Sequence, residues 1–452
     1  MSSEGTLPAQ TRGLPVRRLR LEVLDGADAG KSAVAEAETL SVGTAEGNDL
    51  VLTDPTVSRF HVELSRSADG VRVVDHGSTN GTLVGDVRVE RAVVVPGAVL
   101  RFGKTSARVV DDEAATIELH AAENLGGLRG RSATMRRLMA RVERAARTSA
   151  PVLVIGESGT GKEVVARALH ELGPRREAPF VTVDCGSLSP TLVASELFGH
   201  ERGAFTGAER QHAGAFERAN GGTLFLDEIG ELPASLQPSL LGALERRRFR
   251  RLGGRADISV DLRIVSATNR DLRAEVNAGT FRLDLYYRLA IVVLQVPPLR
   301  ERADDVPLLV EHFLRECGHA GPVGELISPA AMKSLGTHRW PGNVRELRNL
   351  IEATVAMGEP PRLEPDQAPD GGPRDGDPGG AGAPGGIPSS DLIASLLEQP
   401  YGAARTALLA EFESRYLRRL LERAGGNVSR AARDARMDRS HLIDLLHRHQ
   451  LR

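Results

Sequence analysis

The segment GESGTGKE, residues 156–163, decides how the central part of this chain folds. It follows the apolar run PVLVI at 151–155 and opens the helical pattern EVVARALH. Glycines at such a junction let backbone N–H groups close around phosphate oxygens at the N-terminus of a helix. The pattern therefore predicts a strand, a phosphate-binding P-loop and a helix, with Lys162 reaching the β- and γ-phosphates of a nucleotide.

The whole loop is a candidate nucleotide-binding set: Gly156, Glu157, Ser158, Gly159, Thr160, Gly161, Lys162 and Glu163. Many P-loops have a serine or threonine at the last position, where the hydroxyl binds Mg²⁺. Glu163 stands there in this chain, so that hydroxyl is missing. The loop still predicts ATP as the ligand.

A second motif supports the first, because the apolar run at 224–226 ends in Asp227 and Glu228. A buried parallel strand delivers such residues to the edge of the sheet where ligands bind. We expect Asp227 to bind Mg²⁺ and Glu228 to polarise the attacking water. Together the two motifs predict an enzyme that hydrolyses ATP.

Outward from this site, the 452 residues divide by composition into about three domains. Short apolar runs separated by turns predict an all-β sandwich over 16–111, after a disordered start at 1–15. Apolar runs alternating with helical patterns predict an α/β domain with a parallel sheet over 124–358. Residues 359–400 form a Pro- and Gly-rich linker, and 401–452 read as a small all-α domain.

Charge and cysteine content exclude several classes of protein. The formal net charge is −2, so a nucleic-acid signal must be local. The helical end supplies one, with 11 Arg against 6 acidic residues. Cys185 and Cys317 lie outside any CxxC pattern, which favours a reducing cytoplasm over a disulfide framework or zinc site. No apolar run approaches membrane-spanning length, so we expect no membrane partner.

Seven motifs follow one another between residues 124 and 358: GESGTGKE, SELFGHERGAFTGA, GGTLFLDEIGEL, SATNRDL, FRLDLYYRL, VPPLRER and WPGNVREL. In these motifs the region resembles the AAA+ domain of bacterial sigma-54-dependent transcriptional activators. The resemblance implies a P-loop ATPase with a helical lid from about residue 303. It also implies a ring, expected to be a hexamer, that remodels the closed complex of the sigma-54 RNA polymerase holoenzyme.

Further site residues follow from the resemblance alone. Thr268 and Asn269 would sense the γ-phosphate, and Arg345 would be the sensor arginine of the lid. Arg282 and Arg288 would reach the ATP of the neighbouring subunit, and an arginine supplied in this way stabilises charge that develops during phosphoryl transfer. Because such contacts are head-to-tail, activity would require the ring.

One position departs from the family pattern. Asp184 stands in VTVDCGSL where the family typically has an asparagine that acts as switch partner of the catalytic glutamate. A like charge near Glu228 would raise the pKa of one carboxylate if the two groups approach closely.

The uncharged segment GAFTGA lies between the P-loop helix and the strand that ends at Asp227. The resemblance assigns it to sigma-54 contact, through Gly203, Ala204, Phe205, Thr206, Gly207 and Ala208. Gly203 and Gly207 would allow the bend, and Phe205 with Thr206 would form the tip. An insertion at this place can move as the γ-phosphate is bound and lost.

Residues 16–111 resemble a forkhead-associated (FHA) domain, a sandwich that reads phosphothreonine, through LSVGT, SRFH and DHGSTNGT. Ser58, Arg59 and Asn80 would converge on the phosphate. Two positions depart from the family, Thr44 in place of an arginine and Gly85 in place of an asparagine. Two hypotheses therefore stay open: a partner protein bearing phosphothreonine, or a module that keeps the fold and binds protein in another way.

The C-terminal region resembles the Fis-type helix-turn-helix of the same family. Two short helices joined by a tight turn would present Arg439, Ser440, His441 and Arg448 to upstream promoter DNA. The alternative is a plain helical oligomerisation tail. For the whole chain, the alternatives are an AAA+ remodeller of a phosphorylated client and a DNA-bound regulator that does not act through sigma-54.

Overall fold

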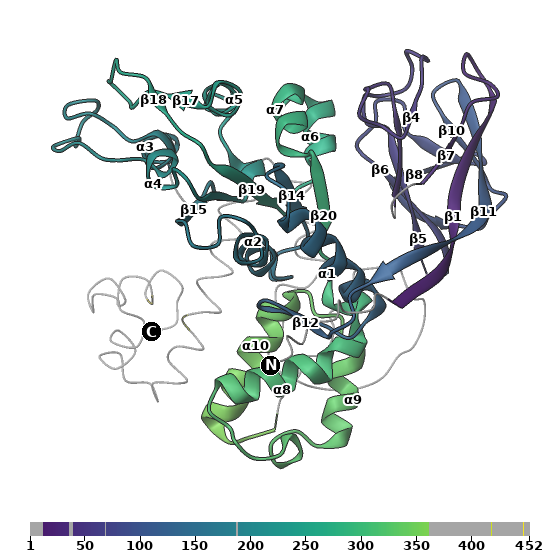
Figure 1. Ribbon diagram of the computed structural model, residues 1–452. Coiled ribbons are helices and arrows are strands. Elements are labelled where there is room, and N and C mark those ends of the chain that lie inside the picture. The colour runs from purple at the N-terminus through teal and green to yellow at the C-terminus, as the bar shows by residue number, and fades with distance from the viewer. Residues whose placement is uncertain are drawn as a thin grey trace, which may run out of the picture. The chain divides into compact units, whose positions relative to one another are not determined.

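The computed structural model describes residues 12–35, 39–67, 69–186 and 189–360, with Leu417 and Leu446 as isolated positions. A β-sandwich, an α/β sheet and a group of helices follow one another along this part of the chain (Figure 1). The expected all-β sandwich and α/β domain with a helical lid are thereby confirmed. The expected helix-turn-helix and its residues Arg439, Ser440, His441 and Arg448 lie outside the described residues.

The sandwich consists of two sheets whose strands alternate between core-facing and outward-facing residues. The described strands of the first sheet, in spatial order, are β2 (Ser32–Val34), β1 (Arg12–Asp25), β11 (Thr105–Leu119), β10 (Val99–Phe102), β7 (Thr82–Val84) and β8 (Val87–Val89). Those of the second are β4 (Leu50–Val51), β3 (Thr39–Gly43), β5 (Val62–Ser67), β6 (Gly70–Asp75) and β9 (Arg91–Val94). Leu21, Leu40, Leu64 and Leu100 are among the side chains fully buried between the sheets.

The α/β domain is built on a parallel sheet, as the alternation of apolar runs and helical patterns predicts. Its strands, in spatial order, are β15 (Phe180–Asp184), β16 (Thr223–Asp227), β19 (Arg263–Thr268), β14 (Val152–Ile155) and β20 (Val292–Gln295). The apolar residues of the central strands are buried on both faces, which explains why these runs do not alternate with polar residues. The carboxyl ends of β14, β16 and β19 therefore meet at one edge.

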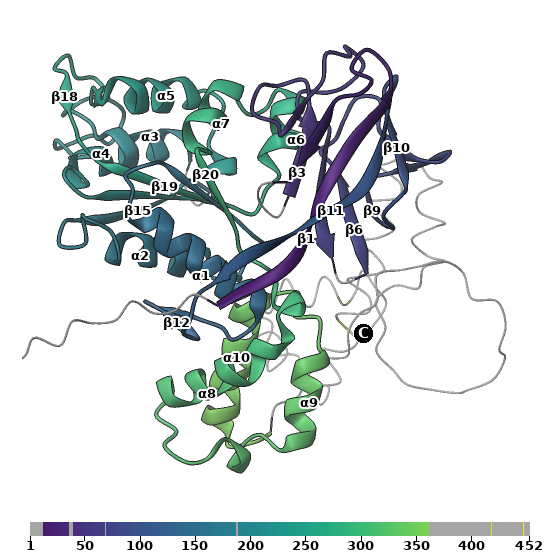
Figure 2. The ribbon, with the colours of Figure 1, turned by 45° about the vertical axis from the view of Figure 1, so that its right-hand side comes forward.

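Helices and short hairpins surround this sheet (Figures 1 and 2). The helices are α1 (Ala133–Ala146), α2 (Lys162–Glu171), α3 (Pro190–Phe198), α4 (Ala215–Arg218), α5 (Gln237–Arg246), α6 (Leu272–Ala278) and α7 (Leu283–Leu289). The hairpins are β12 (Asn124–Leu125) with β13 (Leu128–Arg129), and β17 (Arg248–Phe249) with β18 (Ile258–Ser259). Single 3-10 turns lie at η1 (Ile229–Glu231), η2 (Leu299–Glu301), η3 (Ala303–Asp305) and η4 (Val323–Glu325).

The lid consists of α8 (Val306–Glu316), α9 (Pro329–Thr337) and α10 (Asn343–Met357). These helices bury their apolar faces in a core of their own, around Trp340. The Trp340 side chain is 1% exposed, and its indole N–H donates to the carbonyl of Leu335 at 2.9 Å. Across the described residues, no helix is long and apolar enough to cross a membrane.

A buried arginine joins two helices to the sheet. Arg263, at the start of β19, is 2% exposed and donates to the carbonyls of Ala145, Ala146 and Leu169 at 2.7–3.3 Å. These carbonyls belong to the C-terminal turns of α1 and α2, where helices leave acceptors unpaired. Burial lowers the pKa of the Arg263 guanidinium to about 10. The arginine thus satisfies two helix ends that water does not reach.

Replacing Arg263 with methionine is expected to lower the free energy of unfolding by about 2–4 kcal/mol, because the buried carbonyls of Ala146 and Leu169 lose the Arg263 donor and that of Ala145 loses one of its donors. Methionine preserves most of the side-chain volume, so a cavity contributes little. Denaturant unfolding of the variant would measure the loss. Arg248→Met, at an exposed position of β17, is the matched control. Equal stability of the two variants would contradict a capping role.

Candidate active site

The loop between β14 and α2 has the geometry of a phosphate-binding cradle. Gly159 and Gly161 have φ of +76° and +102°, a region that glycine adopts without steric cost. Gly161 is the N-cap of α2, so the free amides at the start of that helix face the loop. Lys162 is 7% exposed, and its Nζ lies 3.0 Å from the Gly156 carbonyl. The site can therefore hold an anion with both backbone amides and an ammonium group.

The beginning of α10 packs directly on this loop and joins the lid to it. The amide of Val344 donates to the Gly159 carbonyl at 3.0 Å, and Arg345 donates to Ser158 Oγ at 2.9 Å. A Cβ on Gly159 would lie 2.3 Å from the Gly342 carbonyl oxygen. Position 159 thus requires glycine both for its φ and for the approach of the lid.

Two further lid contacts were missed by the sequence reasoning. Arg300 forms paired hydrogen bonds with Glu157 at 2.6 and 2.8 Å, and Asn343 donates to the same carboxylate at 3.1 Å. The hydrogen bond from Arg300 is the main reason that the pKa of Glu157 lies below its usual range. Arg300 belongs to VPPLRER, so the motif was visible although its contact was not.

The expected carboxylates meet at the carboxyl edge of the sheet. Asp184 and Asp227 end the neighbouring strands β15 and β16 in register with one another. Glu228 follows with φ 48° and ψ 49°, a left-handed conformation that is strained for a residue with a Cβ and that clusters at functional sites. Its carboxylate lies 3.2 Å from Lys162 Nζ and accepts from the Asn269 amide at 3.1 Å.

The extra negative charge of Asp184 acts on Asp227. The pKa of Asp227 is raised, first by burial and then by the negative charges of Glu228 and Asp184, while Lys162 works in the opposite direction. The Glu228 carboxylate is instead turned toward Lys162. The aspartate at position 184, which departs from the family pattern, therefore helps to raise the pKa of Asp227, the residue expected to bind Mg²⁺.

Replacing Asp184 with asparagine is expected to lower the pKa of Asp227, because a neighbouring negative charge no longer opposes its ionisation. If ionised Asp227 is the active form, the acid limb of the ATPase pH profile shifts to lower pH. The asparagine oxygen can still accept from the Gly186 amide, which Asp184 bonds at 2.8 Å. An unchanged profile would show that the charge at position 184 has no effect on hydrolysis.

The two expected sensor residues lie at the end of β19. Asn269 is joined to Glu228 by its backbone amide. Thr268 is fully buried, and its hydroxyl accepts from the Arg270 amide at 3.0 Å. The structure therefore brings the sensor strand and Glu228 together through the backbone of Asn269.

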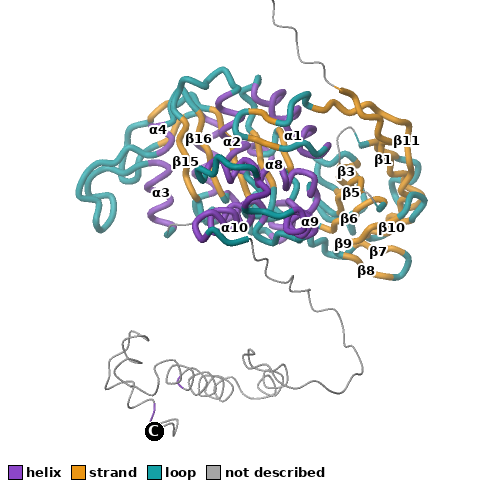
Figure 3. The backbone as a smooth tube through the Cα atoms, turned by 90° about the horizontal axis from the view of Figure 1, so that it is seen from below, coloured by secondary structure: helices purple, strands orange, loops and turns teal. Residues whose placement is uncertain are grey.

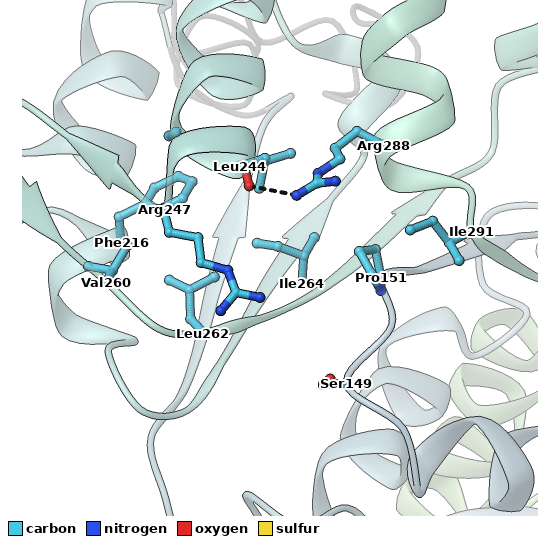
Figure 4. A pocket seen from close by; sticks show the side chains of 11 residues that line it. Ser149, Pro151, Phe216, Leu244, Arg247, Val260, Leu262, Ile264, Arg288 and Ile291 are labelled. Carbon is cyan, nitrogen blue, oxygen red and sulfur yellow. Dashed lines mark hydrogen bonds between the residues drawn. The ribbon is translucent and has the colours of Figure 1, made fainter.

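Arg282 and Arg288 make their hydrogen bonds away from the loop 156–163. Arg282 pairs with Asp284 at 2.8 and 3.0 Å, at the exposed start of α7. Arg288 donates to the Leu244 carbonyl at 3.2 Å and lines a pocket of about 240 Å³ together with Arg247 (Figure 4). Ile291, on the rim of that pocket, is 55% exposed.

The segment GAFTGA forms a tight loop between α3 and α4. Gly203 and Gly207 have φ of +82° and +99°, and the Gly203 amide donates to the Ala208 carbonyl at 2.8 Å. Phe205 is half-buried, with its ring centroid 4.9 Å from that of His200. Thr206 is exposed, whereas Ala208 is buried. The threonine thus stands at the accessible end of the loop, and the phenylalanine packs partly behind it.

A second loop, residues 250–257, supports the first. Arg251 pairs with Glu201 and with Glu217 at 2.8 Å each, and the Leu252 amide donates to the Gly199 carbonyl at 2.9 Å. The loop connections beside α3 and α4 extend outward from the sheet (Figure 3). Sequence reasoning missed this support, because the partners of Arg251 are far from it in the chain.

The sandwich carries its expected phosphate-binding residues on two neighbouring loops. Ser58 Oγ accepts from the Thr79 amide at 3.0 Å, and Asn80 donates to the Thr56 carbonyl at 2.7 Å. These bonds join the loops 56–61 and 76–81. Arg59 and Asn80 are exposed, so their side chains face solvent beside Ser58.

His61 has a structural role between these loops. Its Nδ1 accepts from the Ser58 amide at 3.1 Å, which leaves Nε2 to donate to the Gly81 carbonyl at 3.2 Å. Burial lowers the pKa of His61 and favours the neutral ring that this arrangement needs.

The site belongs to a AAA+ P-loop ATPase. Its phosphate loop lies beside a strand that leads into two carboxylates, and a helical lid packs on that loop. Comparison with known families agrees with this geometry. Residues 128–295 match the model described as the sigma-54 interaction domain, and residues 300–372 match a AAA+ ATPase lid domain. Residues 22–113 match the model described as the cytoplasmic domain of an inner membrane component of T3SS.

Two bacterial regulatory proteins are also similar in sequence to this chain. The transcriptional regulatory protein GlrR of Escherichia coli K12 is 44% identical over 324 residues, which cover 71% of this chain and 67% of GlrR. The Nif-specific regulatory protein of Herbaspirillum seropedicae is 51% identical over 241 residues, 53% of this chain and 44% of that protein. A structure from a study of phosphothreonine-dependent FHA domain interactions matches 21% of this chain and 95% of its own, with 27% identity and a TM-score of 0.19. The chain belongs to the sigma-54-dependent transcriptional activators and is an ATPase, with a β-sandwich before its AAA+ domain.

Proposed function

We propose that this protein uses ATP hydrolysis to remodel the closed promoter complex of sigma-54 RNA polymerase. One observation carries the proposal: an exposed Thr206 stands on a glycine-hinged, uncharged loop within the domain that holds the nucleotide site. A protein surface that is engaged and released in each cycle favours uncharged contacts, because charged groups cost more to desolvate. In vitro transcription with purified sigma-54 polymerase tests the proposal.

In the proposed mechanism, the amides of the loop 156–163 and the Lys162 ammonium bind the phosphates of ATP. Glu228 accepts a hydrogen bond from the attacking water and orients it, and Asn269 fixes this carboxylate through the backbone amide. Lys162 lies 3.2 Å from Glu228, so one ammonium lies within reach of both the phosphate loop and the base. Thr268 and Arg345 would report the state of the nucleotide to the sheet and the lid.

The donor set fits a magnesium ion carried by ATP. Magnesium sites in nucleotide enzymes use one or two carboxylates, with phosphate oxygens and waters as the other ligands. Asp227 provides such a carboxylate at the strand end, and a cation bound there would offset the burial and negative charge that raise its pKa. The ion would neutralise phosphate charge. Glu163, at the last position of the loop, pairs with Arg167 at 2.9 Å on the exposed side of α2.

Assembly into a ring follows from the two arginines of the FRLDLYYRL motif. Arg282 and Arg288 make their bonds away from the loop 156–163, on the surface of α7. We propose that they serve the ATP of a neighbouring copy, which requires a closed head-to-tail oligomer. ATPase activity that rises more than in proportion to protein concentration would support this assembly.

The sandwich is proposed as the regulatory input, through a phosphothreonine-bearing partner. Ser58, Arg59 and Asn80 lie on adjoining loops and can converge on phosphate oxygens. Titration of the full chain with a phosphothreonine peptide and its unphosphorylated twin tests this. Equal affinity for both would favour the alternative, a sandwich that binds protein without reading phosphate.

Specific binding of upstream promoter DNA by residues 401–452 completes the proposal. Arg439, Ser440, His441 and Arg448 would supply contacts to bases and phosphates. In a gel-shift series, binding should weaken steeply as the salt concentration rises, because phosphate contacts release counterions. Binding that is insensitive to salt would contradict this role.

A further inference from the structure

The recognition loops of the sandwich are docked on the ATPase domain of the same chain. Phe60, in the loop 56–61, is 1% exposed and belongs to the apolar core of the ATPase sheet instead of the core of the sandwich. Its ring contacts Tyr286 and Tyr287 of α7, with centroids 5.1 and 6.2 Å apart. Burying an aromatic side chain in this way stabilises the contact. Figure 2 shows α6 beside the strands of the sandwich.

Asn277 of α6 joins both recognition loops to the ATPase domain. Its Nδ2 donates to the carbonyls of Phe60 and His76 at 2.6 and 2.9 Å, and its Oδ1 accepts from the Phe60 amide at 3.3 Å. One carbonyl comes from the loop 56–61 and the other from the loop 76–81. These are the loops that carry Ser58, Arg59 and Asn80.

Charged groups surround this contact. His76 Nδ1 lies 2.6 Å from the carboxylate of Asp271, the N-cap of α6, and Arg273 pairs with Glu63 of β5. Arg273 also lies over the Phe60 ring, 5.6 Å from its centroid. At the edge, the Gly47 amide donates to the Tyr287 hydroxyl at 3.2 Å. Charged and aromatic side chains from both domains therefore complement one another across the contact.

The surface on which the sandwich docks is formed by α6 and α7. These helices connect the sensor residue Asn269 to the two arginines proposed to serve a neighbouring subunit. α6 begins at Leu272, three residues after Asn269, whose amide donates to Glu228. α7 follows, with Arg282 as its N-cap residue and Arg288 in its last turn. In this conformation both arginines bond within their own chain, and Glu228 pairs with Lys162. A contact that holds α6 and α7 thus favours an arrangement in which both arginines keep their partners within the chain.

We infer that the surface formed by Asp271, Arg273, Asn277, Tyr286 and Tyr287 is an internal docking site for the recognition loops of the sandwich. The dock and the phosphate-binding residues lie on the same loops, 56–61 and 76–81. Arg59 and Asn80 stay exposed in the docked form, and a peptide that binds them and extends across these loops competes with the dock. The docked form has low ATPase activity, and release of the sandwich raises it. The inference rests on the proposed function of the sandwich as the regulatory input, and it names the surface through which that input acts.

The inference is tested in the full chain by breaking the docking contact with one substitution in the sandwich and one in the ATPase domain. Phe60→Ala and Asn277→Ala should each raise ATPase activity by about threefold or more, because each shifts the population toward the released form. Val95→Ala removes a side chain that is 67% exposed and is the matched control. Unchanged or lower activity in both dock variants, with circular dichroism showing them folded, would overturn the inference.

A reversible cross-link supplies the opposite perturbation. A Cβ on Gly77 would lie 3.8 Å from the Cβ of Ala274, within the range of about 3.5–4.5 Å found in disulfides. The double variant Gly77→Cys with Ala274→Cys should form an intramolecular bond on oxidation and lose ATPase activity, and reductant should restore both. Each single variant controls for the native thiols Cys185 and Cys317. A folded double variant that does not cross-link would contradict the dock.

Peptide titration separates this inference from the proposed function. If Phe60→Ala raises ATPase activity but no variant prefers the phosphorylated peptide, the dock stands and the phosphothreonine proposal fails. If the phosphopeptide binds the native chain and Phe60→Ala with equal affinity, the dock does not compete with the ligand and the inference fails. The expected result is tighter phosphopeptide binding by Phe60→Ala than by the native chain.

Discussion

Replacing Glu228 with glutamine is expected to reduce the turnover number for ATP hydrolysis by about 10²–10⁴-fold, the usual contribution of a positioned general base. The amide keeps the size of the side chain and can still accept from the Asn269 amide, so the strained backbone at φ 48° is unaffected. It has no negative charge with which to polarise the attacking water. Steady-state phosphate release and nucleotide affinity, measured separately, should show lost hydrolysis with retained binding.

Two comparisons make the Glu228 result specific. Glu231→Gln alters an acidic residue three positions along, which pairs with Arg270 at 2.9 Å on the surface, and should leave hydrolysis within about twofold of native. Lys162→Ala removes the ammonium beside the phosphate loop and should weaken nucleotide binding as well as hydrolysis. Near-native turnover in Glu228→Gln would show that another group activates the water.

Replacing Thr206 with alanine is expected to abolish transcription from sigma-54 promoters while ATPase activity stays near the native level. Thr206 is exposed at the end of its loop, and the loop is held by the hydrogen bond between Gly203 and Ala208 and by the pairs of Arg251. The substitution removes a hydroxyl and a methyl group from this surface and nothing from the nucleotide site. Loss of one central contact of an interface typically weakens it about 30-fold or more.

The measurement compares two rates for the same preparation: phosphate release and abortive transcript synthesis with purified sigma-54 polymerase. Thr206→Ser keeps the hydroxyl and Thr206→Val keeps the shape, so the pair shows which part of the side chain makes the contact. Equal loss of both rates in Thr206→Ala would mean that the loop acts on the ATPase itself. Native transcription would remove the basis for a sigma-54 contact at this residue and favour the alternative of a regulator that acts elsewhere.

The sequence determined the parts of the site that depend on local patterns. Glycines at 159 and 161 between an apolar run and a helical pattern fix a phosphate loop, because their backbone conformations exclude other residues. An apolar strand that ends in Asp227 and Glu228 places both acids at the edge of a parallel sheet. The sandwich was likewise predicted from short apolar runs separated by turns, because this spacing is typical of all-β sandwiches.

The residue on which Asp184 acts could be identified only from the register of two strands. From the sequence, its extra charge was expected to act near Glu228. The pairing of Asp184 with Asp227, together with the turn of Glu228 toward Lys162, directs it to Asp227. A difference of one residue in register would reverse the side of the sheet on which these groups lie.

Only the tertiary structure decided which distant residues share a surface. The bond from Arg300 to Glu157, the support of the GAFTGA loop by Arg251 and the burial of Phe60 against Tyr286 all join positions far apart in the chain. Phe60 shows the reason most clearly. Its neighbours Ser58 and His61 identify a recognition loop, but its own ring is buried because another domain covers it. Periodicity and motifs report what a residue does within its own element, whereas contacts between domains depend on how whole surfaces fit together.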